Sequence, residues 1–81
     1  MPKILEINGF KFYFFSHEPN EPAHIHVDKA GNTAKFWLSP IELARNIGFT
    51  AKELKEIRLL IETHQVKLTE AWHGYFGTKR G

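Results

Sequence analysis

The 81-residue sequence predicts a small α+β domain, in which a four-stranded antiparallel β-meander is followed by a short helix and a long C-terminal helix. Two observations support this prediction. The first half alternates apolar and polar residues with a period of two, which is typical of strands with one buried face. The second half carries apolar residues at spacings of three and four, which is typical of an amphipathic helix. We expect residues 1–76 to form one domain and residues 77–81 a flexible C-terminal tail.

Turn signals separate the predicted strands. The strands are expected over residues 3–7, 10–16, 24–29 and 33–38. Asn8-Gly9 connects the first two, and this dipeptide best tolerates the two positive φ values of a type I′ hairpin turn. Ala30-Gly31-Asn32 connects the third and fourth strands and also has turn chemistry. The four strands therefore form a meander.

The second strand distinguishes the two faces of the predicted sheet. Phe10, Phe12 and Phe14 alternate with other side chains, so we expect the three-Phe face to be the core and the helices to cover it. We call the opposite side the outer face. Alternation along all the strands collects basic and aromatic side chains there: Lys11, Tyr13, His24, His26, Lys35 and Trp37.

The pattern changes after residue 38. Ser39-Pro40 is typical of a helix start and Gly48 of a helix end, which predicts a short helix between them. Thr50 and Glu53 form a capping-box pattern at the start of the long helix. Continuous from residue 51 to 73, that helix would be about 34 Å long, whereas a six-residue strand spans about 20 Å. We therefore expect a bend near residues 64–65 or an aromatic end that overhangs the sheet.

Composition narrows the classes of function. The chain has no cysteine, which excludes disulfides and cysteine-bound zinc and fits a reducing compartment. The formal net charge is +2 and the pI about 9.1, which permits nucleic-acid binding without requiring it. Apolar runs are too short for a membrane span, and the N-terminus leads into a strand rather than a signal peptide. We expect a cytoplasmic protein with no membrane contact.

His24 and His26 are the strongest candidates for a functional site. They stand two positions apart on a predicted strand, so both rings point to the same face. One of two such rings can be neutral while the other is protonated, which suits cleavage of an RNA phosphodiester without a metal. Lys35 would stabilise the developing charge. Tyr13 and Trp37 would stack on bases, with Lys11 as a further nucleic-acid contact.

Two other interpretations of the histidine pair stay open. The pair could hold zinc or another divalent transition metal if a third ligand joined it. The candidates are His17 just before the loop, Asp28, and His64 or His73 of the predicted long helix. Alternatively, His24 and His26 simply form hydrogen bonds and cover the sheet. The pattern alone does not choose among catalysis, metal binding and a structural role. The catalytic interpretation requires no cofactor.

Several segments together resemble one bacterial family, domain of unknown function 4160. They are Pro2 with Ile4, Phe10–Phe14, Pro22–Val27, Ala34–Leu38 and Glu70–His73. The most specific is the His-x-His-Val element, where related members typically carry two prolines before the first histidine and this chain has Ala23 as the second. The resemblance implies a toxin–antitoxin-like pairing with another small protein encoded nearby.

The sequence therefore predicts a small nucleic-acid-directed module of a toxin–antitoxin-like pair. If this module is catalytic, we expect a histidine-dependent, metal-independent endoribonuclease. The alternatives are a metal-binding protein and a non-catalytic, antitoxin-like interaction domain. The expected partners are the cognate protein and RNA or DNA, and homodimerisation is left open.

Overall fold

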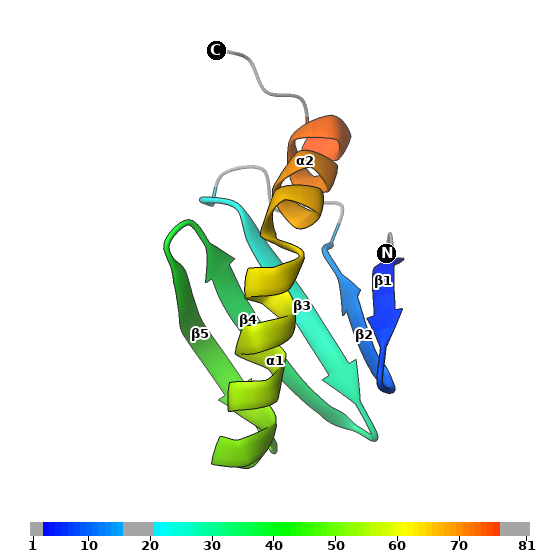
Figure 1. Cartoon of the computed structure of the whole chain (residues 1–81), viewed down its shortest axis with the longest axis vertical. Helices are drawn as coiled ribbons and strands as arrows, with labels where there is room; N and C mark the ends of the chain where they lie inside the picture. The colour runs from blue at the N-terminus through cyan, green and yellow to red at the C-terminus, as the bar shows by residue number, and fades with distance from the viewer. Residues whose placement is uncertain (1–2, 16–20, 77–81) are drawn as a thin grey trace.

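The computed structural model describes residues 3–15 and 21–76, which form a five-stranded antiparallel sheet with two helices (Figure 1). The strands are β1 (Lys3–Ile7), β2 (Phe10–Tyr13), β3 (His24–Lys29), β4 (Asn32–Leu38) and β5 (Ile41–Ile47), and the helices are α1 (Ala51–Thr63) and α2 (Gln65–Phe76). The strand order in the sheet follows the sequence, so the sheet is a meander. The α+β class is confirmed, but the number of strands was predicted wrongly.

The fifth strand occupies the segment for which a short helix was predicted, and that prediction is wrong. Ser39 and Pro40 form the tight turn between β4 and β5, and β5 pairs with β4 along its length. Gly48 has the positive φ, +101°, that a helix-ending glycine would have, but it follows the strand β5 instead. A Cβ at this position would overlap the Asn32 side chain. Turn residues and a terminal glycine delimit a strand as well as a helix, and a seven-residue apolar pattern fits either period.

The two predicted hairpin turns are confirmed. Asn8 and Gly9 have φ values of 55° and 84°, and Ala30 and Gly31 have φ values of 51° and 85°. Two successive positive φ values match the right-handed twist of the flanking strands, which is why these turns lead directly back into the sheet. The turns fix the registers of β1 with β2 and of β3 with β4.

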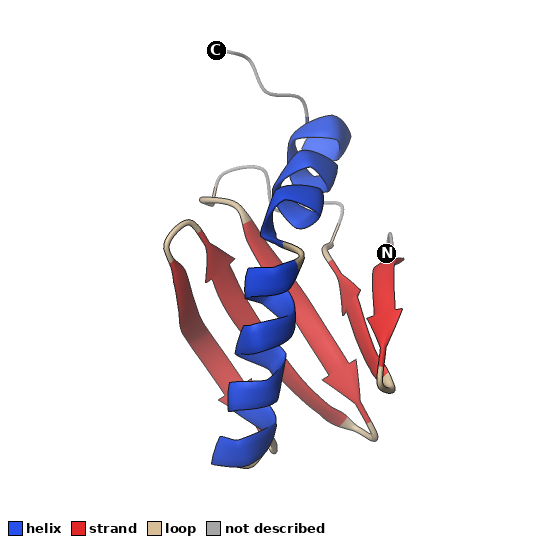
Figure 2. Ribbon diagram, viewed as in Figure 1, coloured by secondary structure: helices blue, strands red, loops and turns tan. Residues whose placement is uncertain are grey.

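The long C-terminal helix is divided in two at the expected place. The Thr50 side chain accepts a hydrogen bond from the Glu53 backbone N–H, and the Glu53 carboxylate accepts one from the Thr50 N–H, so the capping box is confirmed. At the other end of α1, His64 Nδ1 lies 2.9 Å from the Leu60 carbonyl oxygen and donates to it. His64 separates α1 from α2, and Figure 2 shows the change in direction there.

One hydrogen bond ties the start of α2 to the sheet. Gln65 Nε2 donates to the Leu38 carbonyl oxygen at 2.6 Å, at the end of β4. From this point α2 runs past the end of the sheet at which β3 begins (Figure 1). Neither described helix is long and apolar enough to cross a membrane. The predicted tail, residues 77–81, lies outside the described residues.

The helices cover the three-Phe face, as predicted. Phe10, Phe12 and Phe14 are at most 1% exposed. They belong to one buried cluster with residues of β3, β4, the β5–α1 connection and both helices: Ile25, Val27, Ala34, Phe36, Leu38, Phe49, Ile57, Ile61, Leu68 and Trp72. Fully burying one large apolar side chain contributes about 1.5–3 kcal/mol, so this cluster is the main stabilising element of the domain.

Candidate functional site

One row of side chains crosses the outer face on four adjacent strands. Tyr13 of β2 pairs with His26 of β3, His26 pairs with Lys35 of β4, and Lys35 pairs with Arg45 of β5. Directly opposite residues of antiparallel strands share a face, with Cβ atoms about 4.5–5.5 Å apart. We call Tyr13, His26, Lys35 and Arg45 the central row. It brings one aromatic ring, one imidazole and two fixed positive charges into a line.

A concave depression of about 570 Å³ lies over the central row. Phe15 and Asp28 also line it, next to Tyr13 and His26. Three residues predicted from the sequence as site residues do not line it, namely Lys11, His24 and Trp37. The structure therefore divides the predicted outer-face set into a group around the depression and a group outside it.

Aromatic neighbours hold the His26 ring in the depression. The Tyr13 ring stacks on it with a centroid distance of 5.5 Å and an interplanar angle of 22°, and the Phe15 ring meets it edge-on at 4.5 Å. The Tyr13 hydroxyl donates to Asp28 Oδ1 at 3.0 Å. Tyr13 is thus fixed at both its ring and its hydroxyl and is only 8% exposed, whereas Phe15 is 37% exposed.

His24 has a different environment, although it lies on the same face of the same strand. Its side chain is 0% exposed, and its ring lies 4.8 Å from Trp72 of α2 and 5.7 Å from Trp37. The physical reason is the length of β2. Pairing of β2 with β3 ends at Tyr13 opposite His26, so no β2 residue is paired with His24, and Trp72 of α2 contacts its ring there. His24 is therefore buried, although its ring centroid lies only 5.1 Å from that of His26.

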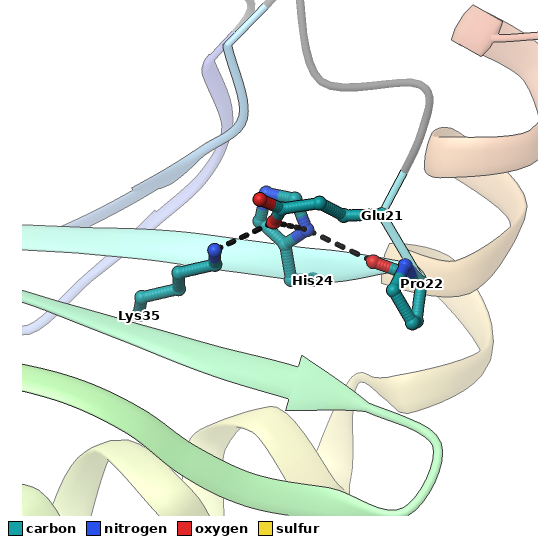
Figure 3. Close-up of polar contacts among 4 residues, drawn as sticks. All are labelled: Glu21, Pro22, His24 and Lys35. Atoms are coloured by element: carbon teal, nitrogen blue, oxygen red, sulfur yellow. Dashed lines mark hydrogen bonds and ion pairs between the residues drawn. The ribbon is translucent and has the colours of Figure 1, made fainter.

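The polar contacts of His24 lead to Lys35 (Figure 3). His24 Nδ1 lies 2.9 Å from the Pro22 carbonyl oxygen; because a carbonyl only accepts, Nδ1 carries a proton. The Glu21 Oε1 atom lies 3.7 Å from that nitrogen and 2.6 Å from Lys35 Nζ. The Glu21 carboxylate therefore lies between the buried imidazole and the lysine of the central row.

The two fixed cations of the central row differ in how their charge is balanced. The Lys35 side chain is 18% exposed, pairs with Glu21, and places Nζ 4.7 Å from the centre of the Trp37 ring. Arg45 is exposed, and it takes part in none of the ion pairs found within residues 3–15 and 21–76. Arg45 is therefore the cation of the row that is best placed to meet an anion from solution.

The remaining predicted contacts lie beside the depression. Trp37 is half-buried, and its ring meets that of His24 edge-on at 5.7 Å, so its predicted stacking on bases stays a prediction. Lys11 is exposed and stands opposite Asp28 on β3 and Glu6 on β1. Both lie on the outer face, as the alternation predicted.

Phe15 and Arg45 line the depression but were not predicted from the sequence as site residues. Phe15 carried a usable signal, because it alternates with Phe14 and so shares a face with Tyr13. Arg45 carried none that could be used, since its segment was assigned to a helix. Only the pairing of β5 with β4 places Arg45 beside Lys35.

The described residues do not test the predicted metal site. No group of three or more His, Asp or Glu side chains arranged to hold a metal ion occurs within residues 3–15 and 21–76. His17, one of the candidate third ligands in the metal alternative, lies outside the described residues. Coordination by His17, His24 and His26 therefore stays a prediction.

These observations define a class of protein, a small α+β domain in which two helices cover one face of an antiparallel meander and an aromatic, basic depression marks the other. The chain belongs to the family described as Domain of unknown function (DUF4160), whose model matches residues 9–73. The matched segment includes every residue of the central row, and the family resemblance inferred from the sequence is confirmed. No curated protein and no solved structure gave a significant match.

Proposed function

We propose that this chain is a small nucleic-acid-binding module that takes single-stranded RNA into the depression on its outer face. The central row is the observation that supports this proposal. It places Tyr13 and His26 in a stacked pair and sets Lys35 and Arg45 beside them on the next two strands. Aromatic sheet faces flanked by cations are how several RNA-binding domains hold unpaired bases and their phosphates.

The arrangement favours a single strand over a duplex. A base must leave its stack to lie against an aromatic side chain, and Phe15 at 37% exposure offers such a surface at the rim of the depression. The exposed Arg45 guanidinium suits a phosphate, because its planar group donates two parallel hydrogen bonds. The base and the phosphate of one nucleotide would then contact neighbouring strands.

The proposal is for binding rather than for cleavage. A two-histidine ribonuclease requires both imidazoles to reach the same phosphate. The His24 ring is 0% exposed and its Nδ1 donates to the Pro22 carbonyl, whereas the His26 ring lines the depression. We assign His24 a supporting role, in which it packs against α2 and orders the Glu21 segment beside Lys35.

We further propose that the module acts within a toxin–antitoxin-like pair, with a small protein encoded nearby as its partner. This part of the proposal rests on the family resemblance alone. Co-expression of the two genes with a tag on one product tests it, and recovery of the untagged product is the expected result. If the untagged protein stays in the unbound fraction, the pairing is wrong.

RNA binding can be tested with a matched pair of arginine variants. Arg45→Gln removes the exposed cation of the central row, and Arg58→Gln removes an exposed cation on α1, where Arg58 pairs with Glu62. Both variants lose one positive charge. By fluorescence anisotropy with a labelled single-stranded RNA, we expect Arg45→Gln to weaken binding about tenfold and Arg58→Gln less than about twofold.

Three outcomes of this experiment would overturn the proposal. They are an equal loss for the two variants, tighter binding of duplex than of single-stranded RNA, and no RNA binding by the natural sequence at low salt. Single-stranded DNA in parallel distinguishes recognition of the ribose 2′-hydroxyl from binding to bases and phosphates alone. Because phosphate contacts release counterions, binding should weaken steadily as salt concentration rises.

A further inference from the structure

The two edge strands of the sheet differ in how they are protected from pairing with another chain. β1 has five residues, and the Lys3–Glu6 ion pair, 2.9 Å long, lies along it. β5 has seven residues, of which all but Ile41 are exposed. Figure 1 shows β5 at the free edge of the sheet, with no other described element along its outer side. A long, exposed edge strand is a template for strand addition.

The exposed surface of β5 is partly apolar. Leu43 is 43% exposed and Ile47 is 48% exposed. Leu43 pairs with Phe36 on the core face, whereas Ile47 pairs with Thr33 on the outer face. Apolar groups therefore flank the edge on both faces of the sheet, so a strand added there would bury apolar surface on both.

A bulge gives β5 an unusual arrangement of charge. Glu42 and Arg45 are three positions apart, and in a regular strand they would point to opposite faces. The register shift after Lys35 leaves Ala44 without a partner on β4, so Glu42 pairs with Trp37 while Arg45 pairs with Lys35. Both partners lie on the outer face. The bulge therefore places one acidic and one basic side chain on the same face of one edge strand.

We propose that β5 pairs antiparallel with β5 of a second copy of this chain. A two-fold axis between Leu43 and Ala44 sets Glu42 opposite Arg45 of the second copy and, by symmetry, Arg45 opposite Glu42 of the second copy. Leu43 then faces Ala44 of the second copy. Opposite charges directly across an antiparallel pair are stabilising, and this register supplies two such pairs from one acidic and one basic residue.

The dimer has a defined architecture. An axis perpendicular to the sheet continues the meander of one copy into that of the other, with all four helices on one face. The two outer-face depressions then open on the opposite face, one on each side of the axis. The inference rests on the geometry of β5 and does not require RNA binding. In the dimer, Glu42 of the second copy would compete with an RNA phosphate for the Arg45 guanidinium.

Charge reversal on β5 tests the proposal. Glu42→Arg gives a strand with two basic residues and Arg45→Glu gives one with two acidic residues, so each variant meets like charges across the axis. By sedimentation velocity over a concentration series, we expect the natural chain to dimerise and each variant to show at least a tenfold higher dissociation constant. Lys67→Glu on α2 is the matched control and should leave the dimer intact.

Mixing the two variants tests the register itself. In a mixed dimer the basic β5 of one chain lies opposite the acidic β5 of the other. An equimolar mixture should therefore dimerise more tightly than either variant alone. The double variant Glu42→Arg/Arg45→Glu should also self-associate. Circular dichroism confirms that each variant is folded.

Several results would overturn the inference. A natural chain that stays monomeric up to near-millimolar concentration removes it, and so does a dimer that survives both charge reversals. A mixture of folded variants that remains monomeric also contradicts the proposed pairing. Glu42→Arg keeps every cation of the central row. Measuring both dimerisation and RNA binding with this variant therefore shows whether a failure concerns the dimer or the proposed function.

Discussion

The two ends of the outer face show how differently one strand can use two histidines. At the covered end, the buried His24 ring contacts Trp72 of α2 and Trp37, while its Nδ1 donates to the Pro22 carbonyl oxygen. At the open end, the His26 ring lines a depression and is held between Tyr13 and Phe15. The two residues are adjacent on one face, yet one is part of the interior and the other part of a surface.

The comparison shows that side-chain direction and side-chain accessibility are set by different things. Alternation along β3 determines the face to which both rings point. Whether a ring is covered depends on where β2 ends and where α2 passes, and these are tertiary features. We therefore assign stability to the covered end and the proposed RNA binding to the open end, and the following experiments separate the two.

The largest expected effect comes from removing the helix side chain that closes the covered end. Trp72 is 6% exposed and contacts both Phe14 and His24. Trp72→Ala should lower the free energy of unfolding by about 3–5 kcal/mol, because it leaves a cavity at the junction of helix and sheet. Urea denaturation measures this loss. Tyr75→Ala is the control, because its ring also contacts Phe14 but is 49% exposed. An equal loss in this variant would show that burial of Trp72 at the covered end is not what stabilises the domain.

The second experiment removes each of the two histidine rings in turn and compares the effects on stability and on RNA binding. His24→Ala should cost about 2–3 kcal/mol of unfolding free energy, since it removes a fully buried ring and leaves the Pro22 carbonyl without that donor. His26→Ala should cost less than about 1 kcal/mol. Binding should follow the opposite pattern, with His26→Ala weakening RNA binding about tenfold. Similar stability losses in the two variants would remove the distinction between the ends.

A smaller effect is expected at Glu21, which joins the two ends. Its carboxylate pairs with Lys35 at 2.6 Å and would compete with an RNA phosphate for that ammonium group. Glu21→Gln should therefore tighten RNA binding about threefold to fivefold, consistent with the modest strength of a partly exposed ion pair. Glu62→Gln on α1, which removes the partner of Arg58, is the matched control and should change affinity little. Weaker binding by Glu21→Gln would show that Glu21 orders Lys35 rather than competing for it.

The smallest effect concerns pH and an exposed carboxylate of the outer face. The hydrogen bond and charge of Lys3 lower the pKa of Glu6 below its ordinary value. A lowered pKa in the folded chain stabilises it above the unfolded-state pKa, and this contribution is lost as the pH falls through the acidic range. The urea midpoint should therefore fall slightly more on acidification for the natural chain than for Glu6→Gln. An identical decrease in both would show that the pair contributes no measurable stability.

Much of the fold was predictable from the sequence because it depends on local chemistry. Asn8-Gly9 has the two positive φ values that its type I′ turn requires, and Thr50 with Glu53 forms the capping box. The alternation of Phe10, Phe12 and Phe14 correctly identified the core face. Each of these features is decided within a few residues of chain, so the sequence pattern suffices.

The remaining features depend on contacts between distant segments. Residues 41–47 have an apolar pattern that a short helix would also accept, and pairing with β4 decides in favour of a strand. The same pairing brings Arg45 to the central row. The burial of His24 follows from the position of Trp72, which no spacing within β3 could reveal. The sequence therefore predicted the sheet face to which each side chain points more accurately than which of those side chains are exposed.

RNA binding to the outer face can be mapped directly by NMR on the uniformly ¹⁵N-labelled natural chain. Titration with short single-stranded RNA should shift the amide resonances of the central row, Tyr13, His26, Lys35 and Arg45, while those of the exposed side of α1 around Arg58 stay in place. Shifts centred on α1, or none at saturating RNA, would contradict the assignment of the open end of the outer face as a nucleic-acid-binding surface.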